Sequence, residues 1–126
     1  MTLTEVILLK SNMRGHKEQI RATRVKVEYR CFVKSLGEGI RYYTFYTKDF
    51  SETGIYLVGD KAKYEFTNSS LLEVGLCTPE DNQINFITKI IRKTNENEFG
   101  LKIVQIDRPA ADKLHKLIKH LLQLPI

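Results

Sequence analysis

Hydrophobic and polar residues alternate along residues 24–34, RVKVEYRCFVK. One face of this segment carries Val25, Val27, Tyr29, Cys31 and Val33, and the other carries Arg24, Lys26, Glu28, Arg30, Phe32 and Lys34. A period of two residues is typical of a strand with one buried face. We therefore expect the first strand of a sheet over residues 24–34.

Five further apolar segments predict strands, several of them rich in aromatic and β-branched residues. They are IRYYTFYTK at 40–48, GIYLV at 54–58, LLEVGLCT at 71–78, INFITKIIRK at 84–93 and FGLKIVQI at 99–106. Turn sequences separate several of them, namely LGEG at 36–39, PEDN at 79–82 and KTNENE at 93–98. We expect a loop at 59–69. Residues 1–13 suit either a short strand or a short helix packed on the other elements.

The hydrophobic period changes after Asp107, where an amphipathic helix is expected. Its apolar face would carry Ala110, Leu114, Leu117, Ile118 and Leu121. Asp107 suits the N-cap and Pro109 suits the first turn. The prediction is an all-β fold with one C-terminal helix near 108–122. The strands would form a small six- to seven-stranded antiparallel β-barrel, with the helix packed on it through Leu114, Leu117 and Leu121.

Length and composition fit one globular domain, since 126 residues can bury a core without disulfide bonds. The N-terminus lacks a basic region and a cleavage site typical of signal peptides, and no apolar run could span a bilayer. Cys31 and Cys77 lie in strand-like segments, where reduced and mostly buried thiols are expected. We therefore expect a cytoplasmic protein without membrane insertion.

The net charge of +5 suggests an anionic partner. The basic excess lies mainly between residues 10 and 34, with Lys10, Arg14, Lys17, Arg21, Arg24, Lys26, Arg30 and Lys34 against Glu18 and Glu28. His115 and His120 are five residues apart and do not share a helix face, so no metal site is predicted. The sequence shows no catalytic arrangement of nucleophile and base, and we do not expect an enzyme.

Asp49, Ser51 and Gly54 lie in the stretch KDFSETGIYLVG at 48–59, directly before an apolar strand. An ordinary turn would explain these residue types, and so would a ligand site at the end of a sheet. In a small barrel, the start of the first strand and the start of the third can lie close together. The basic stretch MRGHKEQIRATR at 13–24 and the turn DFSETG would then face one pocket.

These residues resemble the motifs of the PilZ domain, a bacterial receptor module for cyclic di-GMP. That family carries R-x-x-x-R just before the first strand and D/N-x-S-x-x-G about two dozen residues later. Asp49, Ser51 and Gly54 match the second motif. FGLKIVQID resembles the family's late strand, with Gly100 in the expected place, and a closing helix follows. The resemblance covers roughly residues 17–122.

The first arginine motif departs from the family pattern. Strand alternation makes Arg24 the second arginine, but Ile20 stands four residues before it. Arg21 is the nearest arginine, and Lys17 has the family spacing from Arg21 but lies too early relative to the strand. Either Arg21 acts from one position away or the site is degenerate.

The resemblance implies a binding site for cyclic di-GMP that needs no cofactor and no metal. Its expected ligand contacts are Arg21, Arg24, Asp49, Ser51 and Gly54, with Lys17 and Gly100 as additional candidates. Arginine suits phosphate and guanine because its planar fork makes paired hydrogen bonds and stacks on bases. Residues 1–23 would form an N-terminal segment and basic arm, ordered by the ligand, and residues 24–126 a PilZ-like barrel with its helix.

The resemblance implies a receptor or adaptor that couples the ligand to an unidentified effector protein. The alternative is a degenerate module of the same fold that docks a partner without binding cyclic di-GMP. A third interpretation is a basic barrel that stacks single-stranded nucleic acid on Tyr42, Tyr43, Phe45 and Tyr46. Nucleic acid is the least favoured partner, because strand core explains these aromatic residues.

Overall fold

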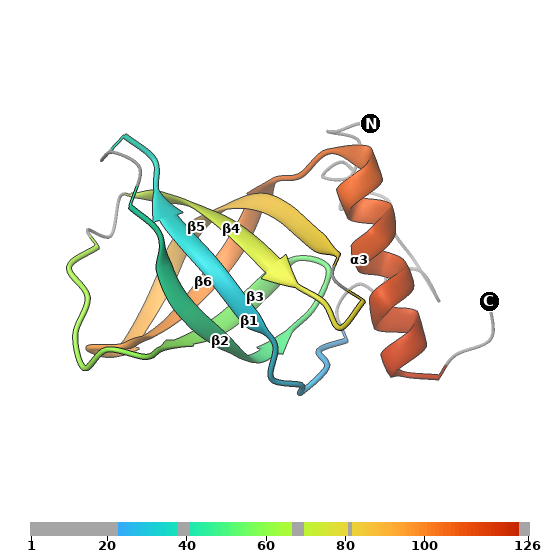
Figure 1. Cartoon of the computed structure of the whole chain (residues 1–126), viewed down its shortest axis with the longest axis horizontal. Coiled ribbons are helices and arrows are strands. Elements are labelled where there is room, and N and C mark those ends of the chain that lie inside the picture. Colours follow the sequence, from blue (N-terminus) through green and yellow to red (C-terminus); the bar gives the residue numbers. More distant parts are fainter. Residues whose placement is uncertain (1–22, 38–40, 67–69, 81, 124–126) are drawn as a thin grey trace.

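The computed structural model describes residues 23–37, 41–66, 70–80 and 82–123. They form six antiparallel strands followed by one helix (Figure 1). The elements are β1 (Arg30–Ser35), β2 (Tyr43–Phe50), β3 (Gly54–Gly59), β4 (Leu71–Cys77), β5 (Gln83–Asn95), β6 (Glu98–Gln105) and α3 (Arg108–Leu121). The fold class predicted from the sequence is confirmed.

The strands close into a barrel in the order β1-β2-β3-β6-β5-β4. β1 completes the ring because it pairs with β2 on one side and with β4 on the other. Alternate side chains point inward and fill the barrel, as period-two patterning requires. The large side chains buried there include Phe45, Phe50, Ile55, Leu57, Leu72, Leu76 and Phe99. This interior is a packed core, so a binding site must lie on the outside of the barrel or at its ends.

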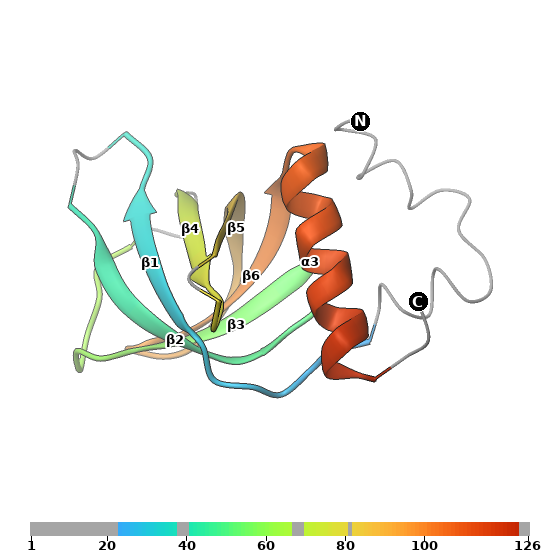
Figure 2. The same ribbon diagram turned by 45° about the vertical axis from the view of Figure 1, so that its right-hand side comes forward.

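Helix α3 stands beside the barrel, on the side where β6 leaves it (Figures 1 and 2). Asp107 is its N-cap, with a side-chain oxygen accepting a hydrogen bond of 2.8 Å from the Ala110 amide. Leu114 and Ile118 are buried, whereas Leu117 and Leu121 are only partly buried against the core. The predicted cap and apolar face are therefore confirmed, with Ile118 lying deeper than Leu117.

The predicted first strand was wrong in its start, because β1 begins at Arg30 instead of Arg24. Residues 25–29 run beside β2 but touch it at separate points. Val25 and Phe50 exchange backbone hydrogen bonds of 2.8 and 3.1 Å. Between that bridge and β1, the Thr47 hydroxyl accepts from the Tyr29 amide and donates to the Val27 carbonyl. A side chain thus replaces part of the strand ladder, which the alternation pattern does not reveal.

Other boundaries moved by a few residues. β2 begins at Tyr43 and not at residue 40, and it continues to Phe50. β5 extends to Asn95, which shortens the turn predicted at 93–98. The loop predicted at 59–69 agrees with the described residues 60–66, which contain no strand. The segment predicted at residues 1–13 lies outside the described residues.

The two cysteines are free, as the sequence suggested. Cys31 is fully buried inside β1, and Cys77 at the end of β4 is partly exposed. Burial raises the pKa of the Cys31 thiol far above its usual range, and the nearby Cys77 raises it further. Cys31 therefore belongs to the core and has the character of a small apolar residue.

Candidate functional site

Arg24 and Asp49 meet at the surface of the barrel although 25 residues separate them in the chain. The bridge between Val25 and Phe50 holds the two segments together. Asp49 immediately precedes Phe50 and points outward from β2, so its carboxylate lies beside the side chain of Arg24. Arg24 Nε donates to Asp49 Oδ1 at 2.5 Å, and the two side chains are 43% and 22% exposed. The pair is open enough for either group to turn toward a ligand.

Ser51 is buried within the turn that connects β2 to β3, with 1% of its surface exposed. Its hydroxyl accepts hydrogen bonds from the Thr53 and Gly54 amides, at 3.1 and 3.3 Å. Its own amide donates to the Gly54 carbonyl at 2.8 Å. Ser51 therefore closes the turn and lies outside the lining of the cavity described below. The predicted contact of Ser51 with a ligand stays a prediction. In the structure its hydroxyl is bonded to the Thr53 and Gly54 amides of the turn.

Gly54 is needed for space and not for an unusual backbone angle. Among the described glycines, only Gly37 has a positive φ. A Cβ on Gly54 would lie 2.9 Å from the carbonyl oxygen of Leu101 on β6 and 3.6 Å from Nη1 of Arg24. The first distance is closer than real Cβ atoms approach. Glycine lets β3 begin tightly against β6, and it also leaves room for the Arg24 guanidinium.

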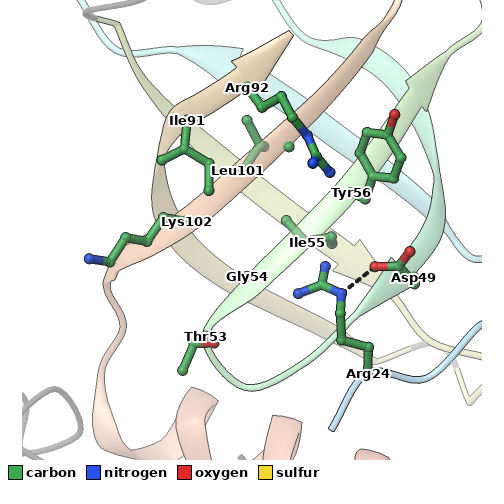
Figure 3. A pocket seen from close by; sticks show the side chains of 11 residues that line it. Arg24, Asp49, Thr53, Gly54, Ile55, Tyr56, Ile91, Arg92, Leu101 and Lys102 are labelled. Carbon is green, nitrogen blue, oxygen red and sulfur yellow. Dashed lines mark hydrogen bonds and ion pairs between the residues drawn. The ribbon is translucent and has the colours of Figure 1, made fainter. Parts of the chain in front are cut away.

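Arg24, Asp49 and Gly54 line a cavity of about 510 Å³ on the outer face of β3, β6 and β5 (Figure 3). Its lining residues are Arg24, Asp49, Thr53, Gly54, Ile55, Tyr56, Ile91, Arg92, Gly100, Leu101 and Lys102. The guanidinium groups of Arg24 and Arg92 approach the centre of the cavity from opposite ends, with Asp49 at one side (Figure 3). Lys102 lies at the rim and points away from that centre. The lining residues include three cationic side chains and one carboxylate, and this excess of positive charge favours an anion.

Arg92, Gly100 and Tyr56 form one row across three adjacent strands. Gly100 on β6 is paired with Arg92 of β5 on one side and with Tyr56 of β3 on the other. A Cβ on Gly100 would lie 3.5 Å from Cβ and 3.6 Å from Nε of Arg92. Because Gly100 has no side chain, Arg92 extends across it, and its guanidinium carbon lies 5.4 Å from the centre of the Tyr56 ring. This is cation–π distance.

Tyr56 is fixed by further neighbours at the upper end of the cavity. Its hydroxyl lies 2.6 Å from Thr94 Oγ1 and 3.0 Å from Glu98 Oε1. Lys48 Nζ lies 5.4 Å from the centre of the ring and 3.7 Å from Glu98 Oε1. The ring and the Arg92 guanidinium are therefore held in place and offer planar surfaces, which suit a flat aromatic ligand.

Four of the residues predicted for the site come together in the structure. Arg24, Asp49, Gly54 and Gly100 all line the cavity. Arg21 and Lys17 lie outside the described residues.

Sequence reasoning missed Arg92, Tyr56, Ile91 and Lys102. The run Ile90-Ile91-Arg92 interrupts the alternation of β5, which marks the irregular pairing found there. Ile90 is buried and Ile91 is 63% exposed, as regular alternation requires, and the irregular pairing after Ile90 leaves Arg92 exposed as well. That break was the available signal for Arg92.

The aromatic residues considered for nucleic acid do not form one exposed platform. Phe45 is buried, with its ring centroid 4.5 Å from that of Tyr64 and 6.0 Å from that of Phe99. Tyr43 lies edge-on to Tyr64, and Tyr42 is 54% exposed. This cluster contributes mainly to the core at the end of the barrel.

A second cavity of about 470 Å³ lies between α3 and the connection from β4 to β5. Its apolar lining includes Tyr29, Ile84, Leu117 and Leu121, and its basic lining includes Lys113, Lys116 and His120, with Glu80 as the acidic residue. Within the ranges that the structure describes, no group of three or more His, Cys, Asp or Glu side chains is placed to hold a metal ion. Likewise, no helix in those ranges is long and apolar enough to cross a membrane.

The comparisons with known proteins agree with this architecture. The fold is similar to the structure of the Bacillus subtilis inhibitor of motility MotI/DgrA, with a TM-score of 0.63, 18% identity and coverage of 79% of this chain and 49% of that one. This chain thus spans about half the length of that protein. The PilZ domain of CeSA from a cellulose-synthesizing bacterium has a TM-score of 0.62 and 14% identity, with 80% and 99% of the two chains covered. The PilZ domain of YcgR from Escherichia coli, solved with c-di-GMP, has a TM-score of 0.64 and 13% identity, with 80% and 89% covered.

At these identities, the structural likeness establishes the fold alone. A comparison with curated protein sequences found no match. A comparison with protein families matches residues 18–120 to the PilZ domain. Because this match spans most of the 126 residues, the chain belongs to the PilZ domain family.

Proposed function

We propose that this protein is a receptor that binds cyclic di-GMP in the cavity beside β3. The observation that carries the proposal is the convergence of Arg24, Asp49, Gly54 and Gly100 on one cavity whose far end holds Arg92. The family match supports it, as does the structural likeness to a YcgR domain solved with c-di-GMP. PilZ domains are ligand-binding modules, and no catalytic step is proposed for this one.

Each side chain has a chemical role in this proposal. The Arg24 guanidinium donates paired hydrogen bonds to a phosphate or to guanine O6 and N7. The Asp49 carboxylate accepts hydrogen bonds from the imino and amino groups of guanine. Ser51 acts by holding the turn that presents Thr53 and Gly54. Arg92 supplies a cation and Tyr56 supplies a ring, and the second guanine of the ligand stacks against them.

Residues 1–23 complete the site as a basic arm, with Arg21 as a phosphate contact and Lys17 as a weaker source of charge. The barrel of residues 24–126 holds the fixed half of the site. The ligand orders the arm against the barrel, and this change is what an effector protein recognises. Such a receptor works in the cytoplasm, where its nucleotide is available.

The proposal is tested by calorimetric titration of the full chain with cyclic di-GMP at one fixed salt concentration. Wild type should bind with a dissociation constant in the micromolar range or below. Asp49→Ala should weaken binding by about 1–3 kcal/mol, the scale of a good contact to a base. Glu65→Ala is the matched control, because it also removes one negative charge but from a site outside the cavity, where Glu65 is 82% exposed. Absence of binding by wild type would overturn the proposal.

The second candidate is a docking module that does not bind the nucleotide. Ile20 stands where the family pattern has arginine, and the second cavity has an apolar floor with Lys113 and Lys116 at its edge. Basic residues beside apolar ones fit an acidic, amphipathic segment of a partner protein. If the titration is silent, Lys116→Glu in a binding assay with such a partner segment becomes the decisive experiment.

A further inference from the structure

Glu52 is a nearly buried carboxylate inside the turn of the proposed nucleotide site. Its side chain is 9% exposed. It lies between Ser51, whose hydroxyl closes the turn, and Thr53, which lines the cavity. A carboxylate removed from water is strongly unfavourable unless hydrogen bonds stabilise it. The partners of Glu52 therefore help to decide whether this turn keeps its shape.

One partner of Glu52 comes from α3. Nδ1 of His115 lies 2.5 Å from Oε2 of Glu52, across 63 residues of sequence. An ionised carboxylate only accepts hydrogen bonds, so the imidazole nitrogen must be the donor. His115 follows Leu114, which is 2% exposed and anchors the helix in the core. The imidazole is thus presented from a fixed part of α3.

The turn transmits the position of Glu52 to the cavity through short connections. The Thr53 and Gly54 amides donate to Ser51 Oγ, and the Thr53 carbonyl accepts from the Ile103 amide at 2.9 Å. Thr53 and Gly54 are lining residues of the cavity. Glu52 thus stands between two residues whose hydrogen bonds shape this end of the cavity.

We propose that His115 is a positioning residue for the nucleotide site, acting through Glu52 without touching the ligand. This inference rests on the proposed function, because it assigns a role toward the same ligand. It also makes α3 part of the binding equilibrium. Since coupling between two sites is reciprocal, a partner that shifts α3 would change nucleotide affinity, and the nucleotide would change how α3 is presented.

The test compares His115→Ala, His115→Asn and His120→Ala in the full chain. Asparagine restores a side-chain nitrogen donor near the position of Nδ1, and His120 is an exposed histidine of the same helix that lines the other cavity. The first measurement is amide hydrogen exchange of Thr53 and Gly54 without ligand. We expect faster exchange in His115→Ala, partial rescue in His115→Asn and wild-type rates in His120→Ala.

The second measurement is affinity for cyclic di-GMP by calorimetry. We expect His115→Ala to weaken binding by about tenfold, within the usual range for coupling between two sites, with the asparagine variant between it and wild type. If wild type binds cyclic di-GMP, and His115→Ala has the same affinity and the same exchange rates as wild type, this inference is overturned. The proposed function would then still stand. Absence of binding by wild type would instead overturn the proposed function, and the exchange rates would still decide whether His115 holds the turn. A general loss of folding in His115→Ala would show as faster exchange in β3 and β6 as well, and His115→Asn then decides.

Discussion

Two glycines of the cavity serve different purposes, which the sequence alone does not distinguish. Gly54 avoids a contact of 2.9 Å between a Cβ and the Leu101 carbonyl oxygen, so it allows two strands to meet. Gly100 has room for a Cβ at ordinary contact distance. Because it has no side chain, the Arg92 side chain can extend across it to Tyr56. The same residue type thus supports the backbone at one position and a side chain at the other.

We expect Gly54→Ala to lower the free energy of unfolding by about 1–3 kcal/mol, the usual effect of forcing a group into a packed site. Gly100→Ala is the matched control on the neighbouring strand, and it should change stability much less. Chemical denaturation of the two variants and wild type measures the difference. Equal effects at the two positions would show that the close approach at Gly54 is unimportant.

At the scale of elements, the pattern of residues predicted strand identity better than strand ends. Alternation persists through residues 24–29, yet no regular strand forms there. There the Thr47 hydroxyl takes the place of a backbone partner for the Tyr29 amide and the Val27 carbonyl. The site was predictable where a motif carried it, at Asp49 and Gly54. Arg92 was missed, because the break in alternation indicates only an irregular strand, and the pairing of β5, β6 and β3 is what brings Arg92 to the cavity.

Thr47 is therefore expected to be critical for the chain segment that carries Arg24. Thr47→Val keeps the shape but removes the hydrogen bonds to the Tyr29 amide and the Val27 carbonyl. Leaving such buried groups without partners costs about 1–3 kcal/mol, and this loss should appear in denaturation curves. Thr47→Ser retains the hydroxyl and should recover most of that stability. A valine variant as stable as wild type would contradict this account.

At the scale of the whole molecule, barrel closure brings the cavity groups together, and the charge of the chain favours the ligand that we propose for them. The ring of six strands fixes Arg24 and Asp49 on one side of the cavity and Arg92 on the other. The net charge of +5, concentrated between residues 10 and 34, adds a general attraction for an anionic ligand. Ile20 interrupts the arginine spacing of the family, so variants at Lys17, Ile20 and Arg21 test which residue of this segment contributes to the proposed site.

Arg24 is anchored by its neighbour Val25, so it should contact the ligand directly, and Arg21 should engage from the arm. Losing a charge-assisted hydrogen bond costs about 1.5–3 kcal/mol, which is roughly ten- to a hundredfold in affinity. We therefore expect Arg24→Ala and Arg21→Ala each to weaken cyclic di-GMP binding by about tenfold or more, and Lys17→Ala to change it little. Ile20→Arg, which restores the family spacing, should tighten binding. Calorimetry of these variants at one salt concentration provides the comparison. If both arginine deletions bind as wild type does and Ile20→Arg has no effect, the arm does not hold the ligand, and recognition must rest on the groups fixed to the barrel.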